Sequence, residues 1–345
     1  MIRDRFLRAL RGDPVDTRPI WLMRQAGRYL PGYRALRERY GIIELARTPE
    51  LAAQVTAEPL ERFDLDAGVV FADIMLPLAG LGVNFSIDAG VGPVVPKPIR
   101  SIHDVRAWSS FDAKTSVGFV GEAIRRFHQL IPDRPLVGFA GGPFTLATYL
   151  VEGGASREFA ATRTMMYGDV GAFTELLDRL TEMTDQYLRF QASAGADVLQ
   201  LFDTYAGILP PPVFRRQVFP SLQRLFEALR PLDLPMIYFS TGSGHLLPDL
   251  SHVGATALGV DWREPLGRVR AQVDPKVALQ GNLDPGALLG SPSRMCEMAQ
   301  SVLDEIPNGR SHVFNLGHGV LPMTEPDRVA ELVRYVHDHG APDGS

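Results

Sequence analysis

Cysteine is almost absent from this chain, since Cys296 is the only one among 345 residues. A single thiol cannot form an internal disulfide, and it excludes zinc and iron–sulfur sites that need several cysteines. Long apolar runs are also missing, because no stretch reaches the roughly 18 uninterrupted apolar residues that suggest a membrane span. Residues 1–12 contain an acidic residue and lack an apolar centre, which predicts a short amphipathic helix and not a signal peptide. We therefore expect a cytoplasmic protein that does not enter a membrane.

Lysine is scarce, with Lys97, Lys114 and Lys276 as its only occurrences. None of them stands at the end of a predicted strand, which disfavours a Schiff-base mechanism. No Gly-x-Ser-x-Gly nucleophile motif occurs. The only close histidine pair, His337 and His339, lies near the C-terminus, where we expect an exposed tail. We therefore predict no metal site and no cofactor.

Positive charge is deficient over the whole chain, whose formal net charge is -5, but not at its start. This overall acidity argues against a nucleic-acid partner. Residues 1–40 hold ten arginines against four acidic residues, a local balance of +6. A basic segment in an acidic protein indicates a local anionic ligand.

Short apolar runs recur along the chain and alternate with amphipathic segments. Buried strands that alternate with helices imply parallel pairing, and eight such units are what a (β/α)8 barrel requires. We therefore predict an α/β fold, with one TIM-barrel catalytic domain over residues 1–345. A doubly wound sheet is the alternative, but its candidate phosphate loop, Gly242-Ser243-Gly244, follows only the fifth run and lacks a third glycine. The predicted strands are Pro19–Met23, Gly68–Ala72, Pro135–Ala140, Asp197–Phe202, Pro235–Ser240, Ala255–Val260, Lys276–Gln280 and His312–Leu316.

One segment interrupts this alternation. Residues 83–100 alternate apolar side chains around Asp88-Ala89-Gly90, which predicts a β-hairpin inserted after the second strand. Its prolines indicate an exposed edge, and we expect a decoration of the barrel, not a separate domain. The predicted helices include Glu50–Phe63, Val117–Leu130, Phe173–Ala194, Val213–Leu229, Arg294–Ile306 and Glu325–His339.

An arginine cluster follows the first predicted strand. Arg24 and Arg28 come directly after the apolar run, and Arg37 follows on a predicted helix over 33–39. Guanidinium groups at the end of a buried strand favour a carboxylate or phosphate site, because each offers a planar fork of donors. A solvated basic loop is the alternative interpretation. Gly27, Tyr29 and the turn at Pro31 favour a loop folded against other groups.

Other polar residues follow the later predicted strands, where the function of a barrel is located. Asp73 stands among apolar neighbours, so it is either a helix cap or an anionic group that faces N–H donors and developing positive charge. Tyr149 lies on a predicted helix after Gly141-Gly142, and a packed core aromatic is its alternative. His318 stands between two glycines, in either a plain loop or a catalytic one.

Two long motifs give the chain a resemblance to a known family. RPIWLMRQAGRYLPGYR from Arg18 and GFAGGPFTLATYLVEGG from Gly138 resemble signatures of the uroporphyrinogen decarboxylases. Shorter matches are FADIMLP from Phe71, LFDTYAG from Leu201 and NLGHGVLP from Asn315. The resemblance spans nearly the whole chain. Thr204 stands where other members carry serine, which keeps the hydroxyl and affects only substrate fit.

The resemblance implies the cofactor-independent decarboxylation of the acetate side chains of uroporphyrinogen III to give coproporphyrinogen III, by a homodimer. It implies that Asp73 faces the pyrrole N–H groups. We expect Arg24, Arg28 and Arg37 to hold carboxylates, while one of them or a bound water supplies protons. A corrinoid-dependent methyltransferase and a non-catalytic tetrapyrrole carrier are the alternatives. The implied catalytic residues are Asp73, Arg37, Tyr149 and His318, and the implied substrate-binding residues are Arg24, Gln25, Ala26, Gly27, Arg28, Asp73, Tyr149, Thr204 and His318.

Overall fold

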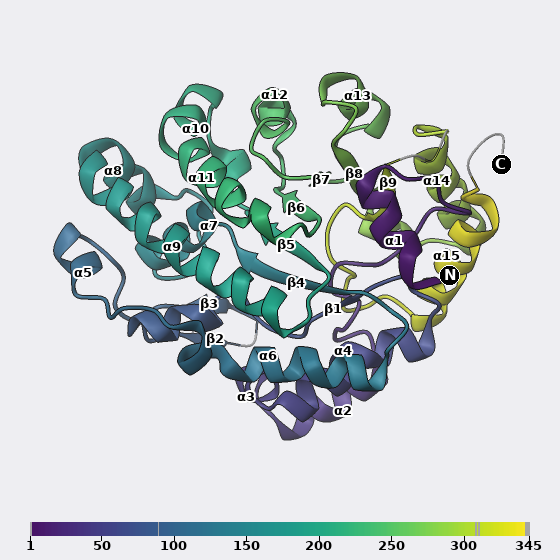
Figure 1. Ribbon diagram of the computed structural model, residues 1–345, viewed down its shortest axis with the longest axis horizontal. Helices are drawn as coiled ribbons and strands as arrows, with labels where there is room; N and C mark the ends of the chain where they lie inside the picture. The colour runs from purple at the N-terminus through teal and green to yellow at the C-terminus, as the bar shows by residue number, and fades with distance from the viewer. Residues whose placement is uncertain (1, 89, 308, 310, 342–345) are drawn as a thin grey trace.

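A curled parallel sheet forms the centre of the computed structural model, which describes residues 2–88, 90–307, 309 and 311–341. Its strands pair only with parallel neighbours, in the order β1-β4-β5-β6-β7-β8-β9 (Figure 1). The α/β fold predicted from alternating strands and helices is thereby confirmed. The strands are β1 Gly68–Val69, β4 Leu136–Gly141, β5 Val198–Phe202, β6 Met236–Phe239, β7 Ala257–Gly259, β8 Ala278–Leu283 and β9 His312–Leu316.

The first predicted strand, Pro19–Met23, differs from expectation. Only Ile20 forms a β-bridge, with Phe314 of β9. The Ile20 N–H donates instead to Asp66 Oδ2 at 2.7 Å, and the Asp66 N–H donates to the Ile20 carbonyl at 2.9 Å. A side chain thus replaces one ladder bond, so this segment closes the sheet between β9 and β1 without forming a regular strand.

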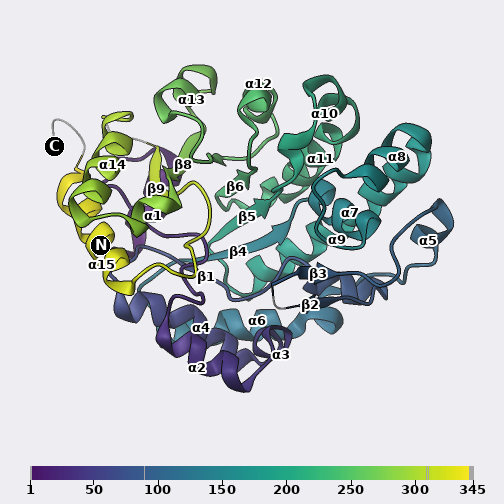
Figure 2. The same cartoon turned by 180° about the vertical axis from the view of Figure 1, so that it is seen from behind.

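Helix α1, Ile2–Arg11, fills the interior of the curled sheet at the end where the strands begin. It lies across the sheet near β8 and β9, as Figures 1 and 2 show. Its Phe6 and Ala9 are fully buried and pack with inward-facing residues such as Val137 and Val198 near the starts of β4 and β5. The predicted amphipathic N-terminal helix is therefore confirmed, and it is part of the core.

A chain of buried amides crosses the barrel interior. The Trp21 Nε1–H donates to Gln280 Oε1 at 2.9 Å, and Gln280 Nε2 donates to Gln200 Oε1 at 3.3 Å. Each of these side chains is at most 1% exposed. Buried polar groups are costly unless they are hydrogen-bonded. These hydrogen bonds therefore fix the positions of the Trp21 segment, β5 and β8 relative to one another.

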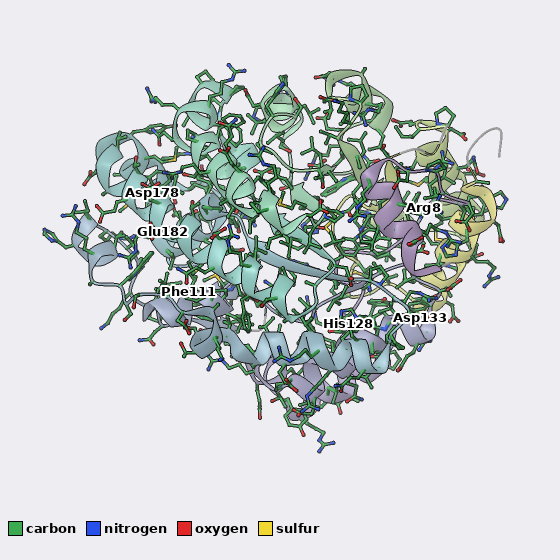
Figure 3. The ribbon with its side chains drawn as sticks, viewed as in Figure 1. Arg8, Phe111, His128, Asp133, Asp178 and Glu182 are labelled. Carbon is green, nitrogen blue, oxygen red and sulfur yellow. The ribbon has the colours of Figure 1, made fainter. Side chains whose placement is uncertain are left out.

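Helices cover the outer face of the sheet and bury most of the remaining apolar side chains (Figures 1 and 2). The labelled Asp178 and Glu182 lie on α9 in Figure 3, where both side chains reach solvent. The remaining helices are α2 Pro31–Arg39, α3 Ile42–Arg47, α4 Pro49–Arg62, α5 Ile102–Arg106, α6 Ala113–Leu130, α7 Pro143–Glu152, α8 Ala160–Gly168, α9 Val170–Ala194, α10 Pro211–Gln217, α11 Phe219–Leu229, α12 Leu247–Leu250, α13 Leu266–Gln272, α14 Pro292–Asp304 and α15 Pro326–His339.

One predicted helix is divided in two. The segment predicted as Val213–Leu229 forms α10 and α11, with Val218 between them. Pro220 stands in the first turn of α11. Proline has no N–H and clashes with the carbonyl four residues earlier, so the helix restarts before it.

The predicted hairpin follows β1 and a short 3-10 helix, Leu76–Leu81. Strands β2, Ser86–Asp88, and β3, Gly92–Val94, pair antiparallel, while Ala89 of the predicted turn lies outside the described residues. The Val95 N–H donates to the Gly153 carbonyl at 2.8 Å, so the return strand is tied to the C-terminal end of α7.

The expected exposed tail around His337 is wrong for that residue. His337 belongs to α15, its side chain is 15% exposed, and its Nε2 lies 2.9 Å from Asp66 Oδ2. Arg5 Nη1 donates to the other Asp66 oxygen at 2.9 Å. Asp66 therefore joins α1, the Ile20 segment and α15 at the N-terminal end of the sheet.

Candidate active site

The parallel strands bring their C-terminal ends to one end of the barrel, and the residues after them form the candidate site. Asp73 follows β1, Thr204 follows β5 and His318 follows β9, while Arg24 follows the Ile20 segment. Tyr149 lies on α7, which begins directly after β4. Residues far apart in the sequence are thus brought to one face by topology alone.

Arg24 has a strained backbone and an exposed side chain. Its φ is 60°, a left-handed conformation that is uncommon for a residue with a side chain and that recurs at functional sites. The aliphatic part of Arg24 lies against Gly319, where a Cβ atom would clash with it. The glycine after His318 therefore lets Arg24 and the His318 loop approach closely.

Gln25 shapes the arginine loop from within. Its side chain is fully buried, its Oε1 accepts the Leu22 N–H at 3.0 Å, and its Nε2 donates to the Ala67 carbonyl at 3.0 Å. The Tyr29 hydroxyl closes the loop by donating to the Gln25 carbonyl at 2.7 Å. Ala26 packs on the hydrophobic cluster beneath this loop. Gln25 and Ala26 thus hold the loop in shape, and the exposed Arg24 and Arg28 project from it.

Asp73 is half-buried and has one oxygen engaged by the protein. Its Oδ1 accepts the Met75 N–H at 2.8 Å, which forms a tight turn. Within the described residues, no other hydrogen bond reaches its carboxylate. Burial raises the pKa of Asp73, and the Met75 N–H and the nearby positive charge of Arg24 oppose that rise. The second oxygen is therefore available to a ligand.

Tyr149 is held by a second tyrosine. The Tyr205 hydroxyl donates to the Tyr149 hydroxyl at 3.0 Å, and their ring centroids are 5.3 Å apart. Burial raises the pKa of Tyr149, as do its contact with the Tyr205 hydroxyl and the negative charge of Asp73, while Arg24 lowers it. Tyr149 therefore remains a protonated donor close to Asp73 and Arg24.

A buried carboxylate positions this tyrosine pair. Asp203 is fully buried, and its Oδ1 accepts the Thr145 N–H at 3.0 Å and the Thr145 hydroxyl at 2.7 Å. The Tyr238 hydroxyl donates to its Oδ2 at 3.1 Å. Thr145 Oγ1 in turn accepts the Tyr205 N–H at 3.1 Å. Asp203 is fully engaged in structure, so it orients α7 against the loop after β5.

His318 lies among cations and an indole ring. The Trp262 ring stands nearly perpendicular to it, with centroids 6.1 Å apart and an interplanar angle of 79°. Burial lowers the pKa of His318 to about 4, and the positive charges of Arg24 and Arg263 contribute to that lowering. The imidazole is therefore neutral near pH 7, and no hydrogen bond within the described part of the chain occupies its nitrogens.

Arg37 forms a separate group with Arg28. Arg37 lies on α2, and its Nη1 donates to the Tyr40 carbonyl at 2.7 Å. Burial raises the pKa of Tyr33, and the positive charges of Arg37 and Arg28 oppose that rise, so both guanidinium groups lie near the Tyr33 hydroxyl. The structure thus brings Arg24, Asp73, Tyr149 and His318 together, and it gathers Arg28 and Arg37 around Tyr33.

Thr204 is less closely connected. Its carbonyl accepts the Thr241 hydroxyl at 2.8 Å, whereas its own hydroxyl makes no hydrogen bond among the residues described. Sequence reasoning missed Tyr205, although it belongs to the LFDTYAG motif. It also missed Tyr33 and Arg263, because their roles depend on contacts across the fold that no local pattern carries.

The described residues include neither a metal-binding cluster nor a membrane-spanning helix. Over residues 2–88, 90–307, 309 and 311–341, no group of three or more His, Cys, Asp or Glu side chains is placed to hold a metal ion. Cys296 lies on α14, as predicted, and is partly buried. Within the same residues, no helix is long and apolar enough to cross a membrane.

A solved structure of another protein shares this fold. A methyltransferase from Methanosarcina mazei superposes with a TM-score of 0.82, and the match covers 98% of each chain at 21% sequence identity. At that identity the likeness shows a shared fold alone.

Sequence comparisons identify the family. The sequence model of the family described as uroporphyrinogen decarboxylase (URO-D) matches residues 1–339 of this chain. A uroporphyrinogen decarboxylase of Chloroflexus aurantiacus is 44% identical over 99% of this chain and 97% of its own length. One from Thermobifida fusca is 46% identical over 97% of this chain and 93% of its own. This chain therefore belongs to the uroporphyrinogen decarboxylase family.

Proposed function

We propose that this protein decarboxylates the acetate side chains of uroporphyrinogen III to methyl groups and so produces coproporphyrinogen III, without a cofactor. The observation that carries the proposal is the 44–46% identity, over nearly the full chain, to enzymes named for this activity. The site supports it chemically. A half-buried carboxylate with a free oxygen, Asp73, lies close to the exposed cation Arg24.

Loss of carbon dioxide from an acetate leaves an electron pair on the methylene carbon, so the reaction needs an electron acceptor. A pyrrole ring protonated at carbon is cationic, and it accepts the electron pair of the breaking C–C bond. A proton then converts the methylene to a methyl group, and the ring carbon gives up the proton it had gained, so the neutral pyrrole is restored and one proton is consumed for each carbon dioxide released. Asp73 stabilises the cationic ring electrostatically and accepts hydrogen bonds from pyrrole N–H groups. Its burial strengthens that interaction, because a less polar surrounding screens charges weakly.

The arginines bind the carboxylates of the substrate. A guanidinium presents two parallel N–H donors that match a carboxylate, and such charge-assisted pairs are the strong ones. Arg24 acts beside Asp73, where it orients the acetate that reacts. Arg28 and Arg37, gathered around Tyr33, bind carboxylates at a second position, and one of the arginines or a bound water supplies protons.

Tyr149 and His318 complete the site with neutral groups. The raised pKa of Tyr149 keeps its hydroxyl protonated, so it donates a hydrogen bond to a carboxylate of the substrate. The pKa of His318 is lowered to about 4, so the ring is uncharged when the enzyme works near neutral pH. A neutral imidazole donates through one nitrogen and accepts through the other. Thr204 adds a hydroxyl at the end of β5.

The family match favours decarboxylation over the two alternatives. The methyltransferase likeness rests on fold at 21% identity. A carrier would need the arginines and Asp73 for binding alone, and it would release no carbon dioxide. Lys276 precedes β8 and so lies at the end of the barrel opposite the site, which is consistent with a reaction that uses no Schiff base.

The test is turnover by purified protein under anaerobic conditions, with uroporphyrinogen III prepared by chemical reduction of uroporphyrin III. We expect four carbon dioxide molecules per substrate and a product that carries four carboxylates, identified by chromatography and mass spectrometry. Binding without carbon dioxide release would refute the proposal and favour the carrier.

We also propose that residues 1–345 act as one catalytic domain, and that the protein works as a cytoplasmic homodimer. The dimer is supported by the family resemblance, and sedimentation of purified protein tests it.

A further inference from the structure

Arg263 is a fourth cation beside the site, after Arg24, Arg28 and Arg37, and none of the roles above uses it. It follows β7 in the run Asp261-Trp262-Arg263, at the same end of the barrel as His318. Its guanidinium carbon lies 4.0 Å from the centroid of the Trp262 ring, and its side chain is 52% exposed. It therefore has both a fixed support and access to solvent.

The guanidinium is held at one corner and open along one edge. Arg263 Nη1 donates to Asp261 Oδ2 at 3.0 Å, and the Arg263 backbone N–H donates to Asp261 Oδ1 at 2.8 Å. Within the described residues, no hydrogen bond uses Nε or Nη2. These two groups form a parallel fork, which is the arrangement that binds a carboxylate through two hydrogen bonds.

The Asp261 carboxylate accepts hydrogen bonds from several donors, so it does not fully neutralise the positive charge of Arg263. Asp261 is 3% exposed and also accepts the Gly242 N–H. The carboxylate is thus satisfied by backbone donors as well as by Arg263 Nη1. The cation–π contact with Trp262 fixes the plane of the guanidinium, which reduces the rotamer freedom lost when a ligand binds.

Trp262 connects Arg263 to the site. Its ring meets His318 edge to face at 6.1 Å, and its backbone lies against Gly317, where a Cβ atom would clash. The positive charges of Arg263 and Arg24 both act on His318. His318 therefore stands between two cations, Arg24 on the Gly319 side and Arg263 on the Trp262 side.

We propose that Arg263 is a substrate-binding residue that holds a side-chain carboxylate of the tetrapyrrole next to His318, an inference that rests on the proposed function. The substrate carries eight carboxylates, more than Arg24, Arg28 and Arg37 can bind. A further preorganised cation at the rim binds one that is not reacting. Such a contact acts equally on ground and transition states, so it lowers KM and leaves kcat unchanged.

The experiment compares Arg263→Gln with a matched control, Arg268→Gln. Arg268 lies on α13 of the same connection, its side chain is 66% exposed, and its Nη1 is 3.7 Å from Glu264 Oε2. Both substitutions remove one positive charge, but only Arg263 stacks on Trp262. Steady-state kinetics with uroporphyrinogen III, thermal melting and NMR titration of the His318 ring are measured for each.

We expect Arg263→Gln to raise KM about tenfold, equivalent to about 1.4 kcal/mol, with kcat within about twofold of the parent and Arg268→Gln unchanged. Arg263→Lys keeps the charge without the fork, so its KM should fall between the two. The His318 ring should titrate at higher pH in Arg263→Gln, even without substrate.

Three results would overturn the inference. A parental KM in Arg263→Gln, with an active parent, removes Arg263 from binding and leaves the proposed function intact. A fall in kcat at parental KM assigns it an indirect effect on His318 instead. A parent that releases no carbon dioxide removes the proposed function and the inference with it.

Discussion

Asp73→Asn separates charge from shape at the candidate site. Asparagine keeps the size of aspartate and an oxygen that accepts the Met75 N–H, so the turn seen at 2.8 Å should persist. What disappears is the negative charge that faces Arg24 and the substrate. If Asp73 serves only the turn, this substitution is nearly silent, since asparagine serves such positions as well as aspartate.

The size of the effect follows from electrostatics. Two unit charges about 4 Å apart interact by about 4 kcal/mol at an effective dielectric of about 20, the value suited to partly buried sites. Removal of a preorganised contact of this kind costs about 100- to 1,000-fold in kcat, which corresponds to about 2.7–4 kcal/mol. The two values agree, so we expect a loss of that order in Asp73→Asn.

The assay is single-turnover decarboxylation, with folding checked by thermal melting. Asp73→Glu keeps the charge and moves it by one methylene, so it should also be slow. Asp203→Asn is the control, because Asp203 is fully buried and bonded to Thr145 and Tyr238. It should lose more stability than rate. Near-parental rates in Asp73→Asn would show that its carboxylate is structural and refute the electrostatic role.

Three further outcomes are expected. Arg37→Ala should impair turnover through weaker substrate binding or proton delivery, and parental steady-state kinetics in the folded variant would return Arg37 to a surface role. The pKa values of His312 and His318 are both lowered to about 4, first by burial. Since an unfolded imidazole titrates near about 6.5, the unfolded state binds more protons between these values, so stability is complete above pH about 6.5 and falls towards about 4. Urea melts against pH check this, and His318→Asn should make the decline shallower. Asp66→Ala should cost about 3 kcal/mol by breaking a buried ion pair, with kcat unchanged, because Asp66 lies at the opposite end of the barrel. Chemical denaturation and steady-state kinetics of the Asp66→Ala variant check this prediction. A fall in activity at parental stability would contradict it.

Sequence patterns were sufficient for the parallel fold, because buried parallel strands appear as continuous apolar runs and their helices as amphipathic segments. They failed where a side chain, instead of a backbone group, is the hydrogen-bond partner. Nothing in the run Pro19–Met23 shows that Asp66 takes the Ile20 N–H, so a regular strand was predicted where only a bridge forms. His337 was misjudged for the same reason, since its partner, Asp66, lies 271 residues earlier.

At the site, the residues after strands could be chosen from the sequence, but their partners could not. The chain order does not reveal that the Tyr205 hydroxyl binds that of Tyr149. Nor does it reveal that Gln25 points into the fold, where it bonds the Leu22 N–H. These contacts depend on how the loops pack at the barrel end. The roles of the site residues remain predictions that the variants above test.

The most direct test is carbon dioxide release by the unmodified protein after chelator treatment and extensive dialysis. We predict that the rate of decarboxylation of uroporphyrinogen III equals that of untreated protein, because the substrate ring itself accepts the electrons. Loss of activity that zinc, pyridoxal phosphate or a corrinoid restores would contradict it.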